Sequence, residues 1–124
     1  MTDCTIQCLL MGEAFSPAHL ANLTSLLLTA QEEPGSIGTI GRYKGKPVPG
    51  GSALLEGRDL ETVVIALHQH FDILRQVGVT DINLTVTLAY TNQCNWEFAP
   101  EPLRLLGEMR ITLGVTCYED SSAL

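Results

Sequence analysis

Apolar residues recur at every second position along three stretches of the chain. The first runs from Cys4 to Leu10, the second from Asp81 to Thr91, and the third from Ile111 to Tyr118. A period of two is typical of a strand with one apolar and one polar face. We therefore predict three strands that helices cover on one face and water covers on the other, as in a mainly antiparallel sheet.

The first predicted helix begins at Pro17. Ser16 before it is a good N-cap, and proline suits the first helical position because its missing N–H has no partner there anyway. We expect this helix to end near Ala30. Leucines at helical spacing would form its inner side, namely Leu20, Leu23, Leu26 and Leu27.

A second, longer helix is expected from Asp59, which would cap it, to about Gln76. Gly78 follows at the place where helices commonly end. A third, short helix begins at Pro100, and a short strand covers residues 52–56. These elements predict an α+β fold: one mainly antiparallel or mixed sheet of four to five strands, with two long helices and one short helix on one face, related to the ferredoxin-like fold. A length of 124 residues fits a single domain, 1–124.

The composition changes between Gln31 and Gly51. Six of the eleven glycines and three of the seven basic residues lie in this segment, which could suggest a phosphate-binding loop. The spacing matches neither of the common glycine-rich phosphate motifs. A surface loop or a short irregular hairpin is the favoured interpretation.

The net charge of the chain indicates which classes of partner it can bind. Fourteen carboxylates against seven basic side chains give a net charge of −7, whereas binding to nucleic acid phosphates requires clustered positive charge. No apolar run approaches the length of a membrane span, and the acidic N-terminus does not resemble a secretory signal. We expect a cytoplasmic protein that binds neither nucleic acid nor membrane.

The four cysteines do not suggest a metal site. Cys4 and Cys8 would lie about 13 Å apart on one strand, which is too far for one ion, and no CxxC motif occurs. In a reducing compartment we expect buried, reduced thiols, which include Cys94 and Cys117. No metal and no cofactor are predicted.

The histidines do not assemble a catalytic set. His68 and His70 are two residues apart on a predicted helix, so they point about 200° apart. His68 could instead pair with Asp72 at the surface. A nucleophile needs an oriented base beside it, and the pattern provides none. We expect no catalytic residue and no enzyme activity.

The C-terminal part of the chain resembles a bacterial domain-of-unknown-function family. The resemblance rests on the pattern N-x-x-F-x-P-E-x-L from Asn95 to Leu103, on Leu106-Gly107 and on the strand that ends in Cys117-Tyr118. Tyr43 stands where that family would have a tryptophan. The resemblance implies an α+β domain without catalytic residues, and a role for some members as immunity proteins of polymorphic toxin systems.

These observations favour a binding protein without a cofactor, specifically an immunity protein that neutralises a basic toxin. Acidity would steer such a partner inward. Trp96 is expected to be buried, but if exposed it would be the best anchor for a partner. The candidate contact residues are Glu32, Glu33, Arg42, Tyr43, Lys44, Glu56, Asp59, Trp96, Glu119 and Asp120.

The alternative is a homo-oligomeric structural or regulatory domain. The wet face of the predicted sheet is rich in threonine and uncharged, and such a face could pair with a second copy of the chain to form a homodimer. High strand propensity on a solvated surface would produce the same composition. The residues of this face are Thr5, Gln7, Asn83, Thr85, Thr87, Thr112 and Thr116.

Overall fold

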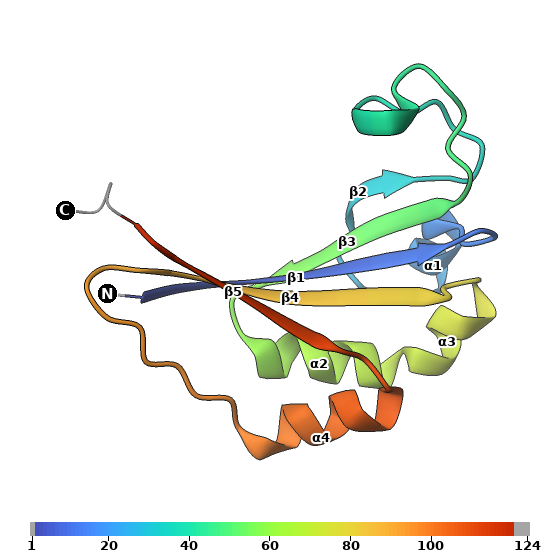
Figure 1. The fold of residues 1–124 in the computed structure, drawn as a ribbon. Coiled ribbons are helices and arrows are strands. Elements are labelled where there is room, and N and C mark those ends of the chain that lie inside the picture. The colour runs from blue at the N-terminus through green and yellow to red at the C-terminus, as the bar shows by residue number, and fades with distance from the viewer. Residues whose placement is uncertain (1, 121–124) are drawn as a thin grey trace. The chain divides into compact units, whose positions relative to one another are not determined.

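The computed structural model describes residues 2–120, and within them five strands form one mixed sheet (Figure 1). The strand order is β2-β3-β1-β4-β5. The strands are β1 (Thr2–Gly12), β2 (Thr29–Glu32), β3 (Gly51–Gly57), β4 (Asp81–Tyr90) and β5 (Leu113–Glu119). The helices are α1 (Pro17–Leu23), α2 (Leu60–Gln69), α3 (Phe71–Gln76) and α4 (Pro100–Met109), with a 3₁₀ turn, η1 (Gly41–Tyr43). The predicted α+β fold with a single sheet is confirmed.

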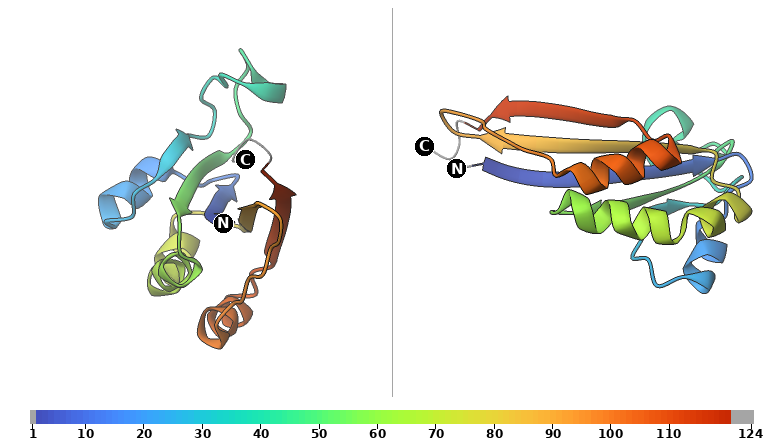
Figure 2. Two further views of the ribbon diagram at one scale, coloured as in Figure 1. Left: turned by 90° about the vertical axis from the view of Figure 1, so that its left-hand side faces the viewer. Right: turned by 90° about the horizontal axis from the view of Figure 1, so that it is seen from below.

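Strand directions make the sheet mixed. β2 pairs with β3 antiparallel, whereas β4 pairs with β5 in parallel from Leu84↔Leu113 to Tyr90↔Glu119. β1 runs opposite to its neighbours β3 and β4 (Figure 2). The connection from β3 to β4 therefore passes over the intervening β1, which is the split βαβ arrangement of ferredoxin-like folds.

The described chain clusters into two compact units. Unit 1 comprises residues 2–8, 56–69 and 83–120, and unit 2 comprises residues 9–55 and 70–82. Strands β1, β3 and β4 contribute residues to both units. A single domain over 1–124 stays a prediction.

In unit 1, α2 and α4 pack against each other on one face of the strands (Figure 2). Their apolar sides and the inward residues of the strands form the core, as the alternation predicts. The threonine-rich face carries no helix in unit 1, and none of its residues is buried. The core residues are Ile6, Cys8, Val63, Val64, Leu67, Leu84, Val86, Leu88, Leu105, Leu106 and Met109.

In unit 2, α1 packs against α3. Ser16 caps α1, because its hydroxyl accepts a hydrogen bond from the His19 N–H at 3.2 Å. Phe15, Leu20 and Leu74 are fully buried in this unit. The predicted cap and the predicted start of the first helix are confirmed.

The first helix is shorter than predicted. It ends at Leu23, because the backbone of Thr24 is extended (φ −136°, ψ 168°). The N–H and the hydroxyl of Thr24 both donate to the Leu20 carbonyl and so satisfy the last turn. Residues 29–32 pair with β3 instead of continuing the helix. Leu27, expected on the inner side, is 85% exposed.

The second predicted helix is interrupted. His70 has φ −110° and ψ 12°, outside the helical region, and separates α2 from α3. Each half packs against a different helix, α2 against α4 and α3 against α1. Four helices are therefore present among residues 2–120, where the pattern predicted three.

The last strand is also less buried than predicted. β5 begins at Leu113 rather than Ile111, and it is an edge strand that pairs only with β4. Val115, which belongs to the apolar side of this predicted strand, is 47% exposed, and Cys117, expected to be buried, is exposed as well. Strand alternation alone could not distinguish an edge strand from a central one.

The glycine-rich segment forms the irregular hairpin that was one of the two expectations. Ile37 bridges Pro47, and the Gly38 N–H donates to the Lys46 carbonyl at 2.9 Å. The Val48 N–H donates to the Ser36 carbonyl at 2.8 Å and closes the base of the hairpin.

Among residues 2–120, none of the helices has the length and apolar character that a membrane span requires.

Candidate functional site

A cavity of about 560 Å³ lies within unit 2. Glu32 of β2 and Tyr43 and Val48 of the glycine-rich hairpin line one part of it. The end of β1, the turn after it, the start of β3 and the start of β4 form the remaining walls. They meet because β1 runs antiparallel to both neighbours, so that its end lies beside their starts. The lining residues are Met11, Gly12, Glu13, Glu32, Tyr43, Val48, Pro49, Gly50, Gly51, Ser52 and Asp81. We call this hollow the acidic cavity.

The charged residues of the acidic cavity are all carboxylates. Glu13, Glu32 and Asp81 line it together with Tyr43. The remaining lining is mostly apolar side chain and backbone. A ligand with an apolar stem and a cationic end, such as a lysine or arginine side chain, matches this chemistry.

A second, smaller cavity of about 170 Å³ lies within unit 1. Trp96, in the linker between β4 and α4, contributes an aromatic wall and is 41% exposed. The prediction that Trp96 is buried is therefore wrong. The other lining residues are Cys4, Arg58, Asp59, Leu60, Glu61, Glu97, Phe98, Ala99 and Pro102. We call it the tryptophan cavity.

Asp59 caps helix α2 and also lines the tryptophan cavity. Its carboxylate accepts hydrogen bonds from the N–H of Thr62 at 3.1 Å and from the Thr62 hydroxyl at 2.7 Å. These hydrogen bonds lower the pKa of Asp59, since they stabilise the charged form. The predicted N-cap is confirmed.

Two pairs of predicted contact residues are thus brought to cavities: Glu32 with Tyr43, and Asp59 with Trp96. The other candidates lie elsewhere. Glu33 accepts a hydrogen bond from the Ser16 hydroxyl and so ties the segment after β2 to the start of α1.

Five further charged candidates also lie outside both cavities. The guanidinium carbon of Arg42 lies 5.6 Å from the centre of the Tyr43 ring. Lys44 is exposed just after η1. Glu56 and Glu119 are exposed near the ends of β3 and β5, and the N–H of Asp120 donates to the Tyr90 carbonyl at 2.7 Å.

Sequence reasoning missed some charged lining residues. These are Glu13 and Asp81 in the acidic cavity, and Arg58 and Glu97 in the tryptophan cavity. Glu13 follows β1 and Asp81 begins β4. An antiparallel pairing of these two strands places the end of β1 beside the start of β4. Predicting that pairing would have placed the two carboxylates near each other.

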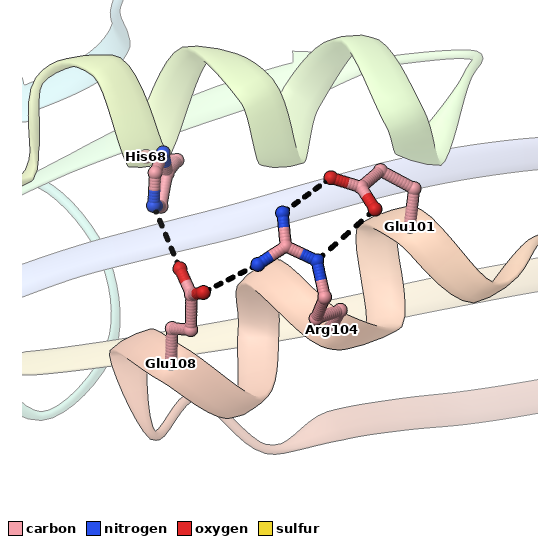
Figure 3. A network of polar contacts seen from close by, with 4 residues as sticks. All are labelled: His68, Glu101, Arg104 and Glu108. Atoms are coloured by element: carbon pink, nitrogen blue, oxygen red, sulfur yellow. Dashed lines mark hydrogen bonds and ion pairs between the residues drawn. The ribbon is translucent and has the colours of Figure 1, made fainter.

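His68 pairs with Glu108 of α4 at 3.1 Å rather than with Asp72 (Figure 3). The break at His70 places Asp72 on a different helix, so His68 and Asp72 do not lie one turn apart on the same helix. Arg104 joins the network by bonding both Glu108 and Glu101 (Figure 3). Its hydrogen bond to Glu101 lowers the pKa of that carboxyl. All four side chains are solvent-exposed, as in a surface network.

The thiols differ from the expectation in part. Cys8 is buried, and burial raises its pKa to about 12. Cys4 and Cys94 are half-buried, and Cys117 is exposed. Within residues 2–120, no group of three or more His, Cys, Asp or Glu side chains could hold a metal ion.

Comparison with known proteins found no family model, no curated protein and no solved structure that matches the chain. The chemistry of the two cavities therefore carries the functional argument. Both combine an aromatic ring with carboxylates, and both suit a cationic group.

Proposed function

We propose that this protein binds a basic protein partner directly, as a cytoplasmic immunity protein that neutralises a toxin. The observation that carries the proposal is the acidic cavity, where Glu13, Glu32 and Asp81 face a largely apolar lining. A lysine or arginine side chain of the partner would place its stem against Tyr43 and its charge among the carboxylates.

The overall charge supports the same class of partner. A net charge of −7 attracts a basic protein and raises the rate of association. Toxins that cut nucleic acids carry positive charge because they hold phosphates. A nuclease toxin is therefore the partner we expect.

Capture from the native host tests the proposal. The immobilised protein should retain the basic product of a neighbouring gene, and co-expression should protect cells from that product. Retention of no basic protein, or no protection by co-expression, would contradict the proposal.

Binding kinetics then test the cavity itself. We expect the double variant Glu32→Gln, Asp81→Asn to dissociate from the captured partner at least tenfold faster. The control Asp3→Asn, Asp72→Asn removes the same charge at exposed positions outside the cavity. The control should slow association only, because distant charges act by steering. Equal dissociation rates for the two variants would exclude the cavity as the contact.

A second candidate function is self-association as a homo-oligomeric structural or regulatory domain. β5 is an edge strand with Val115 47% and Tyr118 51% exposed, and open edges pair readily with other chains. Light scattering at high concentration should then give a dimer that Val115→Lys dissociates. A monomer at high concentration would contradict self-association.

A further inference from the structure

The hairpin between β2 and β3 is basic, although the chain as a whole is acidic. Arg42, Lys44 and Lys46 lie on it and are all exposed, and the two lysines are the only ones in the sequence. No carboxylate occurs anywhere in residues 34–55. We call residues 36–48 the basic hairpin. A negative net charge for the whole chain thus conceals one segment that is positively charged.

Two isoleucines are exposed on the same hairpin. Ile37 is 59% exposed and Ile40 is 81% exposed. The hairpin projects from β2 and β3, so both side chains lie on the part of unit 2 that extends beyond these strands (Figure 1). Large apolar side chains gathered on an exposed surface are typical of a contact with another macromolecule. The basic hairpin therefore offers a partner both apolar area and positive charge.

Backbone contacts hold the basic hairpin in one conformation. The Gly38 N–H donates to the Lys46 carbonyl and the Gly45 N–H donates to the Gly38 carbonyl, both at 2.9 Å. The backbones of Gly38 and Tyr43 lie so close together that a Cβ atom on Gly38 would sit 2.4 Å from the Tyr43 carbonyl oxygen. A preformed surface of this kind loses little conformational entropy when it binds.

The positive charge of the hairpin and the negative charge of the acidic cavity do not neutralise each other within the chain. Among residues 2–120, no ion pair joins Lys44 or Lys46 to a carboxylate. Glu13 and Glu32 of the acidic cavity likewise take part in none of the ion pairs of this part of the chain. Both sets of charges are therefore available to a second molecule.

The basic hairpin and the acidic cavity are neighbours within unit 2. Tyr43 and Val48 belong to the hairpin and also line the cavity. A two-fold dimer needs both halves of its contact on one surface of each copy, because that surface meets itself across the axis. The adjacency of hairpin and cavity satisfies this requirement.

We propose that two copies of the chain form a two-fold symmetric dimer in which the basic hairpin of each copy docks on the acidic cavity of the other. Lys44 and Lys46 would place their ammonium groups among the carboxylates of the second copy. The isoleucines would meet the largely apolar remainder of the lining. A cavity of about 560 Å³ accommodates more than one side chain.

This dimer differs from self-association through β5, because the edge of the sheet takes no part in it. It also requires no toxin, although it would cover the acidic cavity, so that the dimer contact and the proposed toxin contact would exclude each other. A basic hairpin with exposed isoleucines would also suit an anionic lipid surface. A second copy is favoured because it supplies the carboxylates that match the hairpin and the cations that match the cavity.

Sedimentation velocity of the full chain across a range of concentrations tests the dimer. We expect a dimer that added salt weakens, because salt screens the ionic contacts. The hairpin variant Lys44→Glu, Lys46→Glu and the cavity variant Glu32→Lys, Asp81→Lys should each weaken dimerisation by about tenfold or more, because like charges then face each other.

A control variant separates this contact from the effect of net charge. Arg58→Glu, Arg110→Glu makes the same change of charge as the hairpin variant, at exposed positions in unit 1. This control should dimerise nearly as well as the unmodified chain. Val115→Lys, which opposes pairing through β5, should also leave the dimer intact.

Mixing the hairpin variant with the cavity variant gives the sharpest test. Acidic hairpins then meet basic cavities, and basic hairpins meet acidic cavities, across the same interface. An equimolar mixture should therefore form a heterodimer although each variant alone is monomeric. Recovery of the dimer on mixing also shows that both variants are folded.

Four outcomes would overturn the proposal. They are a monomer at every concentration, a dimer that survives in the hairpin variant, a dimer that Val115→Lys dissociates, and a mixture of the two variants that stays monomeric. Vesicles of anionic phospholipid test the other surface. A monomeric protein that binds these vesicles through Lys44 and Lys46 would contradict the dimer and assign the basic hairpin to a lipid surface.

Discussion

The backbones of Gly12 and Gly78 lie so close together that a Cβ atom on Gly12 would sit 1.9 Å from the Gly78 carbonyl oxygen. Gly12 ends β1, and Gly78, with φ 102°, follows α3. Next to them, the Thr80 N–H donates to the Met11 carbonyl at 2.9 Å. This close approach holds the end of β1 against the start of β4 in unit 2.

Gly12→Ala should therefore destabilise the protein by about 3 kcal/mol, because the added methyl group meets backbone that cannot move aside cheaply. Gly107→Ala is the matched control. Gly107 lies within α4 with no atom near an added Cβ, so alanine should stabilise the helix by about 0.5–1 kcal/mol. Urea unfolding measures both, and a neutral Gly12→Ala would contradict the close approach.

Removing the cap of α2 should lower stability in a pH-dependent way. The folded pKa of Asp59 is depressed by its hydrogen bonds from Thr62. Its contribution is therefore complete above the unfolded pKa, about 3.9, and is lost as the pH falls through the folded pKa. Asp59→Asn should keep a capping oxygen but lose this acid-side dependence, whereas Asp59→Ala should lose the cap at every pH. Unfolding midpoints across the acid range compare the three proteins.

The stability that the α2–α4 contact provides should come from its buried apolar residues rather than from the exposed ion pairs of Arg104. Leu106 is 3% exposed, so Leu106→Ala should cost about 2–5 kcal/mol. Arg104→Met removes the exposed bonds to Glu101 and Glu108 and should change stability little, since exposed ion pairs are screened. A larger loss for Arg104→Met than for Leu106→Ala in urea unfolding would contradict this order.

The tryptophan cavity should be detectable by charged quenchers. Trp96 lies beside the carboxylates of Asp59, Glu61 and Glu97 and one guanidinium, that of Arg58. We expect caesium ions to quench its fluorescence more efficiently than iodide ions, because the local charge attracts cations. Added salt should reduce the difference. Equal quenching at low salt would show that these carboxylates do not set the potential around the ring.

Much of the fold could be predicted from local patterns. The alternation around Ile6 and Val86 identified the strands β1 and β4, and Ser16 with Pro17 identified the start of α1. The end of α1 was missed because Leu23 and Leu27 keep helical spacing although neither is buried. Pairing of residues 29–32 with a strand more than twenty positions later decides that boundary, and no local pattern contains it.

The candidate site was predictable only in part for the same reason. Glu32 and Trp96 were identified by residue type, but their neighbours Asp81 and Asp59 come from distant segments. The exposure of Trp96 depends on the path of a linker without regular structure between β4 and α4. Composition indicates the charge of the surface, whereas strand order decides which charges meet.

The parallel pairing of β5 with β4 makes the length of the α4–β5 connection significant. β5 buries few side chains, so its register is held by the backbone ladder more than by an apolar face. A slip of one residue would turn Cys117 to the opposite side of the sheet and put Thr116 or Tyr118 in its place. One residue inserted after Arg110 would therefore exchange the two faces of β5 without removing any of its side chains.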